Sequence, residues 1–503
     1  MKPLSRAQES VLLLVAGALY PLALAPLSLW PLTFFSISIF FWRLQQQPAK
    51  QLLFKAMVFG SGLFLSGVSW VYVSMYDHGS LSMPVAFVGT VIFCLFLAFV
   101  FALPFTLNAL IPQNPLSLML GLPAIWVIGE WIRSWLFTGF PWLYAGYSLT
   151  DHWLNGWAPI VGVLGLSYLV ASGAAALTQL ALRRKDSCLA PGPTITLALI
   201  ASLVIGGYAL QKIDWTTATD RTLSVVLIQP NIQQANRWSP SQRESILEQL
   251  SEQTEPYWGA DIIIWPEGAI PALPAAVMEY LIEVDNLAKV NQTTLFTGIP
   301  TRDYHSRHIF NSMMGLGESR GQYDKTRLVP AGEYIPFEET LRGLNSFFDL
   351  PMSSFSSGAS NQPLLSAKGQ LIATAICYEI AYPNLVAKTT LGASMIMTVS
   401  NDAWFGDSMA PQQHMQMARM RAIENAKPLM RGTNNGITAL VDYRGNIYQQ
   451  LEQFTAGELE GVIRPRQGQT PFALFGSWPT VIAALLCCAV LILIRKLNRI
   501  KKT

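Results

Sequence analysis

Eight apolar stretches of roughly membrane-spanning length constrain how this chain can fold. A helix that crosses the hydrocarbon core of a bilayer, about 30 Å thick, needs about 20 apolar residues. Seven stretches precede residue 211 and the eighth lies near the end of the chain: 11–26, 29–44, 54–75, 85–110, 116–137, 160–182, 194–210 and 478–494. We therefore predict a polytopic α-helical membrane bundle with eight spans.

The composition is typical of a membrane protein and gives no sign of a nucleic-acid-binding protein or a metalloprotein. Charged residues make up only 13% of the chain, against about 25% in an average soluble protein. The net charge of +3 gives no reason to expect a nucleic-acid partner. The five histidines lack a metal-ligand pattern, because His305 and His308 have no third ligand nearby. We predict neither a metal nor a cofactor.

The distribution of Lys and Arg predicts the orientation of the spans, because cytoplasmic loops are enriched in these residues. With the N-terminus inside, the inner loops and the C-terminal tail hold Arg43, Lys50, Lys55, Arg183, Arg184, Lys185, Arg495, Lys496, Arg499, Lys501 and Lys502. The outer loops near Asp77 and Asp151 hold neither residue type. We expect both termini in the cytoplasm and residues 211–477 in the periplasm of a Gram-negative bacterium.

One charged pair lies within the fifth stretch. Glu130 and Arg133 are three residues apart near its outer end, beside Trp131 and Trp135. The spacing fits an ion pair on one helix face, and Arg133 could instead contact a lipid headgroup. The two tryptophans do not separate these interpretations, because aromatic residues are common at any membrane interface. Both interpretations stay open.

Residues 211–477 follow a different pattern, in which short apolar runs alternate with helical periodicity. The runs have the length and polar flanks of buried strands: 223–229, 261–265, 294–297, 371–376 and 394–399. Segments 239–254 and 277–290 have helical periodicity, and the first begins with Ser239-Pro240, a favourable N-cap and first-turn pair. This alternation predicts an α/β sheet with helices on its faces.

Chemically useful side chains follow several of these strands. Glu267 comes after the strand at 261–265, Lys325 lies further along the chain, and Cys377 ends the strand at 371–376. Strand ends gather catalytic groups in α/β folds, and a carboxylate, an ammonium and a thiol can act as base, cation and nucleophile. Each residue alone has a simpler interpretation: a solvated surface charge, or for Cys377 a small buried hydrophobic residue.

The surrounding motifs resemble the three signatures of the nitrilase, or carbon–nitrogen hydrolase, superfamily. They are WPEG at 265–268, YDKTRLVP at 323–330 with a following Gly332-Glu333, and CYE at 377–379. SNDAWFG at 400–406 and RGTNNG at 431–436 extend the match. With seven apolar stretches before and one after, the whole chain resembles the apolipoprotein N-acyltransferase family.

The resemblance implies a domain organisation and a fold. Residues 1–210 would form a seven-helix transmembrane region, 211–477 a periplasmic catalytic domain, and 478–503 the eighth transmembrane helix with a basic cytoplasmic tail. The catalytic domain would be a nitrilase-like αββα sandwich, so that the fold combines a membrane bundle with an α/β domain.

The resemblance also assigns roles at the site. Cys377 would be the nucleophile, Glu267 the general base and Lys325 the cation that stabilises the oxyanion. A free thiol has a pKa of about 8.5 and is mostly protonated at neutral pH, so the chemistry itself requires such a base. The backbone N–H of Tyr378 would be a second oxyanion donor.

Two further carboxylates receive supporting roles. Glu333 would orient Lys325 or pass a proton to the leaving group. Glu379 could do the same, or could be a structural hydrogen-bond acceptor, and the sequence does not separate these alternatives.

The implied reaction is ping-pong acyl transfer by a monomer without a cofactor. Cys377 would take a fatty acyl chain from a membrane phospholipid, at sn-1 of phosphatidylethanolamine, as a thioester. The α-amine of the S-diacylglyceryl cysteine that begins an apolipoprotein would then receive the chain as an amide. Both partners are lipidic, which gives a physical reason for joining the catalyst to a helix bundle.

Water must be kept from a thioester, and this demand directs attention to residues 347–355. Phe347, Phe348 and Phe355 lie there among serines and a proline, a composition that predicts a loop rather than a core strand. We expect this segment to be a lid that dips into the bilayer. Trp238 is a further candidate for contact with an acyl chain or the acceptor.

Two other functions fit parts of the sequence. A membrane-tethered amidase would use the same Glu267, Lys325 and Cys377 to release an acid and ammonia, and the motifs cannot separate the two reactions. A transporter would need ionisable residues within its spans, and apart from Glu130 and Arg133 the spans are nearly uncharged. The eight apolar stretches favour lipid chemistry.

Overall fold

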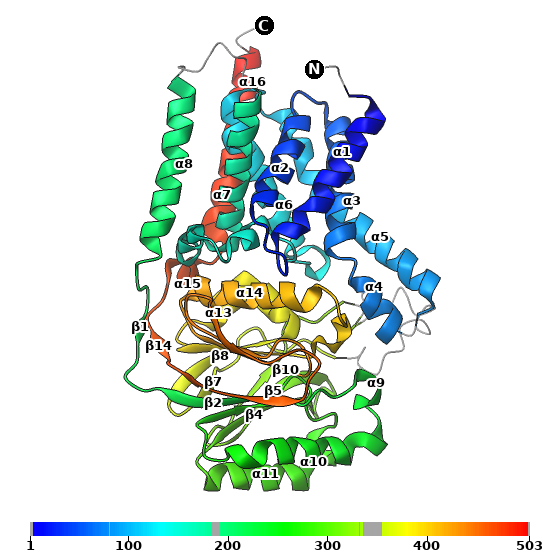
Figure 1. Cartoon of the computed structure of the whole chain (residues 1–503), viewed down its shortest axis with the longest axis vertical. Coiled ribbons are helices and arrows are strands. Elements are labelled where there is room, and N and C mark those ends of the chain that lie inside the picture. The colour runs from blue at the N-terminus through cyan, green and yellow to red at the C-terminus, as the bar shows by residue number, and fades with distance from the viewer. Residues whose placement is uncertain (1–3, 80, 183–190, 331, 335–354, 501–503) are drawn as a thin grey trace. The chain divides into compact units, whose positions relative to one another are not determined.

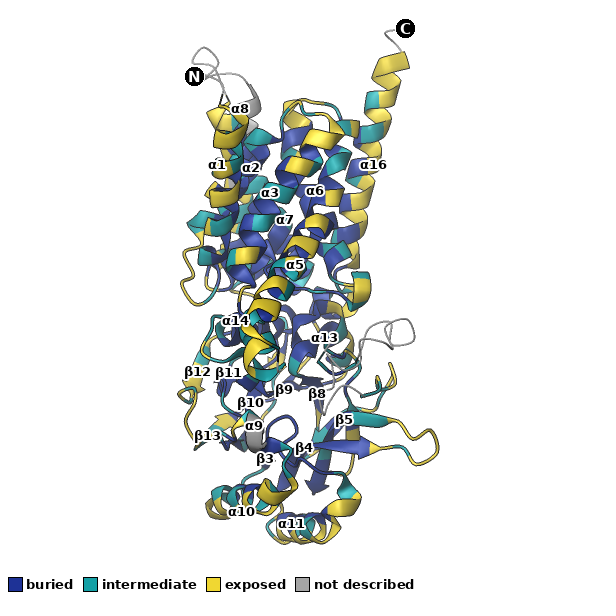
Figure 2. Ribbon diagram, turned by 90° about the vertical axis from the view of Figure 1, so that its right-hand side faces the viewer, coloured by how far each residue is buried: buried dark blue, intermediate teal, exposed yellow. Residues whose placement is uncertain are grey.

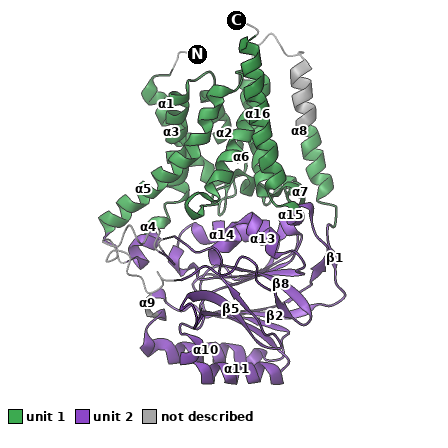
Figure 3. Cartoon of the chain, turned by 180° about the vertical axis from the view of Figure 1, so that it is seen from behind, with its two compact units in different colours: residues 1–72, 83–214, 475–503 green, residues 73–82, 215–474 purple. Residues whose placement is uncertain are grey.

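The computed structural model describes residues 4–79, 81–182, 191–330, 332–334 and 355–500. The chain divides into two compact units (Figure 3). The first comprises residues 1–72, 83–214 and 475–503, and the second comprises residues 73–82 and 215–474. Residues 73–82 thus group with the second unit, although they begin at the end of the third apolar stretch.

The first unit is built of helices, and a helix covers part of each apolar stretch (Figure 1). The main helices are α1 (Arg6–Leu19), α2 (Pro31–Arg43), α3 (Ala49–Gly67), α5 (Met83–Ala102), α6 (Leu122–Arg133), α7 (Ala158–Ala181), α8 (Pro191–Leu210) and α16 (Trp478–Ile500). The expected apolar helices are therefore present in this unit.

The prediction of eight full-length spans is not confirmed. Within the described residues, three segments are long and apolar enough to cross a membrane: Met83–Leu110, Trp153–Ala181 and Trp478–Ile500. A fourth is obtained if α3 and the following Val71–His78, bent by 60°, count as one span. Helix α1 has only 14 residues, or about 21 Å at 1.5 Å per residue. It ends early because Pro21 lies in the 3-10 turn Tyr20–Ala23 that follows.

Helices α1 and α3 pack backbone against backbone at two glycines. A Cβ on Gly17 would lie 2.0 Å from the carbonyl oxygen of Phe59, and a Cβ on Gly62 would lie 2.1 Å from that of Leu14. Small residues at a helix crossing let the backbones approach closely and strengthen van der Waals packing, which holds helices together in apolar surroundings. Neither glycine could become alanine without separating the two helices.

The second unit contains two six-stranded sheets. One has the order β13 (Gly457–Ile463), β2 (Leu223–Gln229), β3 (Ile262–Ile264), β4 (Thr294–Arg302), β5 (Ile309–Gly317) and β6 (Gln322–Asp324). The other has the order β12 (Ile447–Gln450), β11 (Ala439–Val441), β10 (Leu429–Thr433), β9 (Met395–Ser400), β8 (Gln370–Ile376) and β7 (Leu365–Ala367). In each sheet three neighbouring strands run parallel: β2–β3–β4 and β8–β9–β10.

These sheets pack face to face between two layers of helices. Successive strand side chains point to opposite faces, so Val225 and Leu227 enter a core that β8 and β9 share, whereas Val226 and Ile228 face the other way. That outer face is covered by α10 (Arg243–Thr254) and α11 (Met278–Val290). Helices α13 (Pro383–Thr389) and α14 (Ala410–Asn425) cover the second sheet, and exposed residues remain on α10 and α11 (Figure 2). The predicted αββα sandwich is confirmed.

The five predicted strands correspond to β2, β3, β4, β8 and β9. The predicted helix start at Ser239 is confirmed only in position. Ser239 precedes a 3-10 turn, Pro240–Gln242, that leads into α10, but its hydroxyl bonds to that of Ser241 rather than capping a backbone N–H.

Candidate active site

Glu267 lies in a sharp turn directly after β3, and only 7% of it is exposed. Gly268 has a φ of +53°, and the Arg237 guanidinium donates hydrogen bonds to the carbonyls of both Glu267 and Gly268. The carboxylate accepts from Asn311 Nδ2 at 2.8 Å and from the Asn401 backbone N–H at 2.9 Å. The turn and these donors fix both carboxylate oxygens.

Lys325 follows β6 and is almost completely buried, at 1% exposure. Its Nζ lies 3.2 Å from Glu267 Oε1 and 2.9 Å from Glu333 Oε1. Glu333 also accepts from Asn311 Nδ2 at 2.9 Å and from the Val329 backbone N–H at 2.8 Å. One ammonium thus joins two carboxylates, and Asn311 bridges the same two groups.

The charges of this cluster set its pKa values. Burial raises the pKa of Glu267, but the Lys325 ammonium and the hydrogen bonds from Asn311 and Asn401 outweigh burial and hold the pKa below its ordinary value. Burial lowers the pKa of Lys325, but the charges of Glu267 and Glu333 raise it well above its ordinary value. The cluster is therefore an ionised base beside a permanent cation.

Cys377 begins a 3-10 turn (Cys377–Ala381) immediately after β8 and is half-buried. Its φ is +51°, in the left-handed region that non-glycine residues seldom adopt. Burial and the negative charge of Glu267 raise the pKa of the thiol, and the nearby Lys325 only partly offsets them. The thiol is therefore protonated at rest, and a nucleophilic attack would require a base.

Glu379 ties the Cys377 turn to the segment after Lys325. It is fully buried and accepts hydrogen bonds from the backbone N–H groups of Ile376 and Thr326, at 2.8 and 2.7 Å. The Tyr323 hydroxyl also donates to it, at 3.1 Å. These contacts agree with the structural alternative for Glu379, a hydrogen-bond acceptor that joins two strand ends.

Sequence reasoning missed Arg237 and Asn311. Asn311 interrupts an apolar strand, and a buried polar side chain requires partners, so its position in β5 was a usable signal. Arg237 carried no such signal, because its role depends on a tertiary contact with a turn that lies 30 residues away.

Three of the other predicted contact residues, Trp238, Tyr378 and Phe355, are described in the second unit. The indole Nε1 of Trp238 is buried and has no hydrogen-bond partner within the described part of the chain. The Tyr378 ring packs edge-on against Tyr382, with centroids 5.2 Å apart. Phe355 is half-buried, and its backbone N–H donates to the Glu333 carbonyl at 3.0 Å. Phe347 and Phe348 lie outside the described residues, and the proposed lid stays a prediction.

Family comparisons cover both units of the chain. Residues 16–176 match the model of the apolipoprotein N-acyltransferase N-terminal domain, and residues 224–467 match that of the carbon-nitrogen hydrolases. An apolipoprotein N-acyltransferase of Azotobacter vinelandii is 40% identical over 499 residues, which cover 97% of this chain and 96% of the relative. The chain belongs to the apolipoprotein N-acyltransferase family.

Other members of the apolipoprotein N-acyltransferase family are similarly related. The Pseudomonas aeruginosa relative is 42% identical, with 93% of this chain and 92% of the relative covered. The Vibrio cholerae relative is 41% identical, with 95% and 94% covered. The chain is therefore an acyltransferase, and its apolar helices together with these Gram-negative relatives indicate an inner-membrane protein.

Arg133 belongs to the first unit, in which it is 3% exposed. Its guanidinium donates to the Trp142 carbonyl and lies over the rings of Phe64 and Tyr144. Glu130 accepts from the Trp126 indole and the Ala145 backbone N–H, both at 2.8 Å. Both side chains hold the turn at 139–145, which neither the ion-pair nor the headgroup interpretation predicted.

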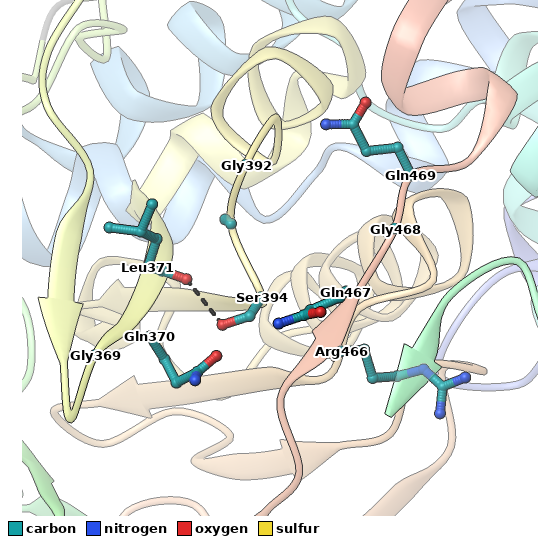
Figure 4. Close-up of a pocket in the computed structure, with 10 residues that line it drawn as sticks. Gly369, Gln370, Leu371, Gly392, Ser394, Arg466, Gln467, Gly468 and Gln469 are labelled. Atoms are coloured by element: carbon teal, nitrogen blue, oxygen red, sulfur yellow. Dashed lines mark hydrogen bonds between the residues drawn. The ribbon is translucent and has the colours of Figure 1, made fainter. Parts of the chain in front are cut away.

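A pocket of about 550 Å³ lies where β8 and β9 begin, at the end of these strands that is opposite to Cys377 (Figure 4). Gln370 and Leu371 begin β8, and Ser394 precedes β9 and bonds to the Leu371 carbonyl. Cys377 follows the far end of β8. Seven strand residues span about 23 Å at 3.3 Å per residue, so this pocket is distinct from the cluster around Glu267.

Proposed function

We propose that the chain transfers a fatty acyl group from a membrane phospholipid to the N-terminal amine of a diacylated apolipoprotein, through a thioester on Cys377. The observation that supports this most is the buried Glu267–Lys325–Glu333 cluster, whose charges act on the Cys377 thiol at a strained turn. The same polypeptide contributes apolar helices, as an enzyme with two lipid substrates requires.

In the first half-reaction, Cys377 Sγ attacks the sn-1 ester carbonyl of phosphatidylethanolamine while Glu267 takes the thiol proton. The C–S bond forms, and the negative charge on the ester oxygen is stabilised by Lys325 and by the Tyr378 backbone N–H. The ester C–O bond then breaks, and Glu267 returns the proton to the departing alkoxide. The products are a lysophospholipid and the acyl thioester.

In the second half-reaction, the α-amine of the S-diacylglyceryl cysteine attacks the thioester carbonyl. Glu267 accepts a proton from the amine as the C–N bond forms. Breaking the C–S bond releases the sulfur, which regains the proton from Glu267 as the thiol. An amide is more stable than a thioester, so this step runs downhill and regenerates the enzyme.

The membrane setting completes the proposal. We propose that eight helices anchor the chain in the inner membrane of a Gram-negative cell, with the catalytic unit in the periplasm and both termini in the cytoplasm. A monomer suffices, because Glu267, Lys325 and Cys377 come from one chain. An acyl donor that stays within the bilayer would reach the thiol without exposing the thioester to water.

The test is acyl transfer by the detergent-solubilised full chain from phosphatidylethanolamine labelled in its sn-1 chain to a synthetic diacylglyceryl-cysteine peptide. We expect the label as an amide on the peptide, together with lysophospholipid. Release of ammonia from a soluble amide, without transfer of the label, would instead support the tethered amidase.

A further inference from the structure

A buried polar cluster contacts the backbone of Cys377 and takes no part in the reaction steps above. We call Ser400, Asp402, His414 and Arg431 the Asp402 cluster, and each member is at most 1% exposed. Three members come from SNDAWFG and RGTNNG, two motifs for which the reaction steps give no role, and His414 comes from α14. Arg431 Nη2 donates to Asp402 Oδ2 at 2.8 Å, and the Ser400 hydroxyl donates to Asp402 Oδ1 at 2.5 Å.

His414 connects this cluster to the backbone of the nucleophile. Its Nε2 lies 3.1 Å from the carbonyl oxygen of Cys377. A carbonyl oxygen can only accept a hydrogen bond. His414 must therefore carry a proton on Nε2 and donate it to Cys377.

The other ring nitrogen faces Arg431 and Asp402. His414 Nδ1 lies 3.0 Å from Arg431 Nη2 and 3.2 Å from Asp402 Oδ1. A guanidinium can only donate, so the shorter contact is favourable only when Nδ1 is unprotonated. Burial and the Arg431 charge lower the pKa of His414, in agreement with a neutral ring protonated at Nε2.

The hydrogen bond from His414 reaches the residue with the strained backbone. The left-handed conformation of Cys377, with a φ of +51°, is unfavourable for a residue with a Cβ and persists only where surrounding contacts impose it. The cluster thus holds Cys377 at its carbonyl.

We propose that His414 is a positioning residue, whose Nε2–H holds the Cys377 carbonyl and so keeps the turn that directs the thiol toward Glu267 and Lys325. Arg431, which Asp402 holds in place, donates to Nδ1 and so fixes the ring of His414 in the required tautomer and orientation. The inference rests on the proposed role of Cys377 as nucleophile.

Two amide substitutions of different length test this role. His414→Gln can place an N–H near the Nε2 position, whereas His414→Asn is one methylene shorter and does not reach the Cys377 carbonyl. We expect kcat for acyl transfer to stay within about threefold of the parent in His414→Gln and to fall about 10- to 100-fold in His414→Asn, because misplaced reacting groups react slowly. KM for both substrates should change little. His308→Asn, in an exposed loop, is the control.

Alkylation of Cys377 by iodoacetamide, followed by mass spectrometry, gives a readout without any lipid. It should slow in His414→Asn and not in His414→Gln, and the effect should largely disappear on a Glu267→Gln background, where the base is already lost.

If His414→Asn does not fold, His414→Leu replaces it as the variant without a donor. Equal rates in the Gln and non-donor variants, or an unchanged effect on the Glu267→Gln background, would overturn the proposal. If phosphatidylethanolamine is not the acyl donor, transfer fails but the alkylation rates of the His414 variants keep the expected pattern. Failure of the proposed function is therefore distinguishable from failure of the His414 proposal.

Discussion

At the scale of single residues, the nucleophilic thiol is not ionised in advance, whereas the side chains that would activate it are. The Cys377 thiol has a raised pKa, whereas Glu267 is held ionised and Lys325 charged. The base and the cation are therefore in place before any substrate arrives. Charges fixed in advance need no reorganisation as the transition state forms, which makes them effective in a buried site.

Removal of the base carboxylate should affect chemistry more than binding. Glu267→Gln keeps the size of the side chain but cannot take the thiol proton, so we expect thioester formation to slow by about 10²- to 10⁴-fold. The rate of acyl-enzyme accumulation measures this. Glu333→Gln is the matched control, because it removes the other carboxylate on Lys325 and should cost less. Equal losses in the two variants would contradict the assignment of Glu267 as the base.

The pH dependence of thioester formation should show no thiol ionisation near neutrality. Because the pKa of Glu267 lies below its ordinary value of 4.5, the base stays ionised above that pH, and the rate should fall only in more acidic solution. Because the pKa of Cys377 is raised above its ordinary value of 9.0, the rate should not climb between pH 7 and about 9. Single-turnover rates across this range test the prediction, and a steady rise through about pH 8.5 would indicate direct attack by a pre-formed thiolate.

At the scale of elements, the strands that carry the site were predictable because they are short, apolar and bounded by polar residues. Burial on both faces leaves a clear sequence signal, so Glu267 and Cys377 could be placed at strand ends. The contacts of Arg237 and His414 could not be predicted, because they depend on how distant segments meet, whereas Asn311 could be recognised as a buried polar residue that requires partners. The predicted stretch 11–26 extends past the end of α1, because hydrophobicity alone does not show that the helix ends before Pro21.

The Asp402 cluster should also stabilise the second sheet near neutral pH and lose this effect in acid. Burial raises the pKa of Asp402, but the Arg431 charge and the contacts with His414 and Ser400 together outweigh burial, and the folded-state pKa lies below the ordinary value of 3.8. This contribution is present above pH 3.8 and is lost as the pH falls toward the folded-state pKa. His414, whose pKa is also lowered, acts in the same direction below its ordinary pKa of 6.5.

The thermal midpoint of the detergent-solubilised chain, measured between pH 7 and about pH 3, tests this linkage. Asp402→Asn should lower the midpoint at pH 7 and flatten its decline in acid. Asp407→Asn is a control in the same loop, at an exposed position, and should retain the parent curve. Parallel curves for the parent and Asp402→Asn would show that Asp402 does not contribute to acid sensitivity.

At the scale of the whole molecule, the charge distribution predicts on which side of the membrane each loop lies. In a chain whose native cysteines are replaced, Ser306→Cys should react with a membrane-impermeant maleimide added outside spheroplasts, because the catalytic unit is expected to face the periplasm. Gln46→Cys, in an inner loop, should react only after the membrane is permeabilised. Both positions are exposed, so the reverse pattern would contradict the proposed orientation.

The central claim is a fatty acyl thioester on Cys377. Intact-mass spectrometry of the purified full chain after incubation with phosphatidylethanolamine, before any acceptor is added, tests it most directly. We predict a mass increase of one acyl group that maps to Cys377, is removed by neutral hydroxylamine and is absent from Cys377→Ala. An unmodified mass under conditions that support acyl transfer, or an acyl group on another residue, would contradict the claim.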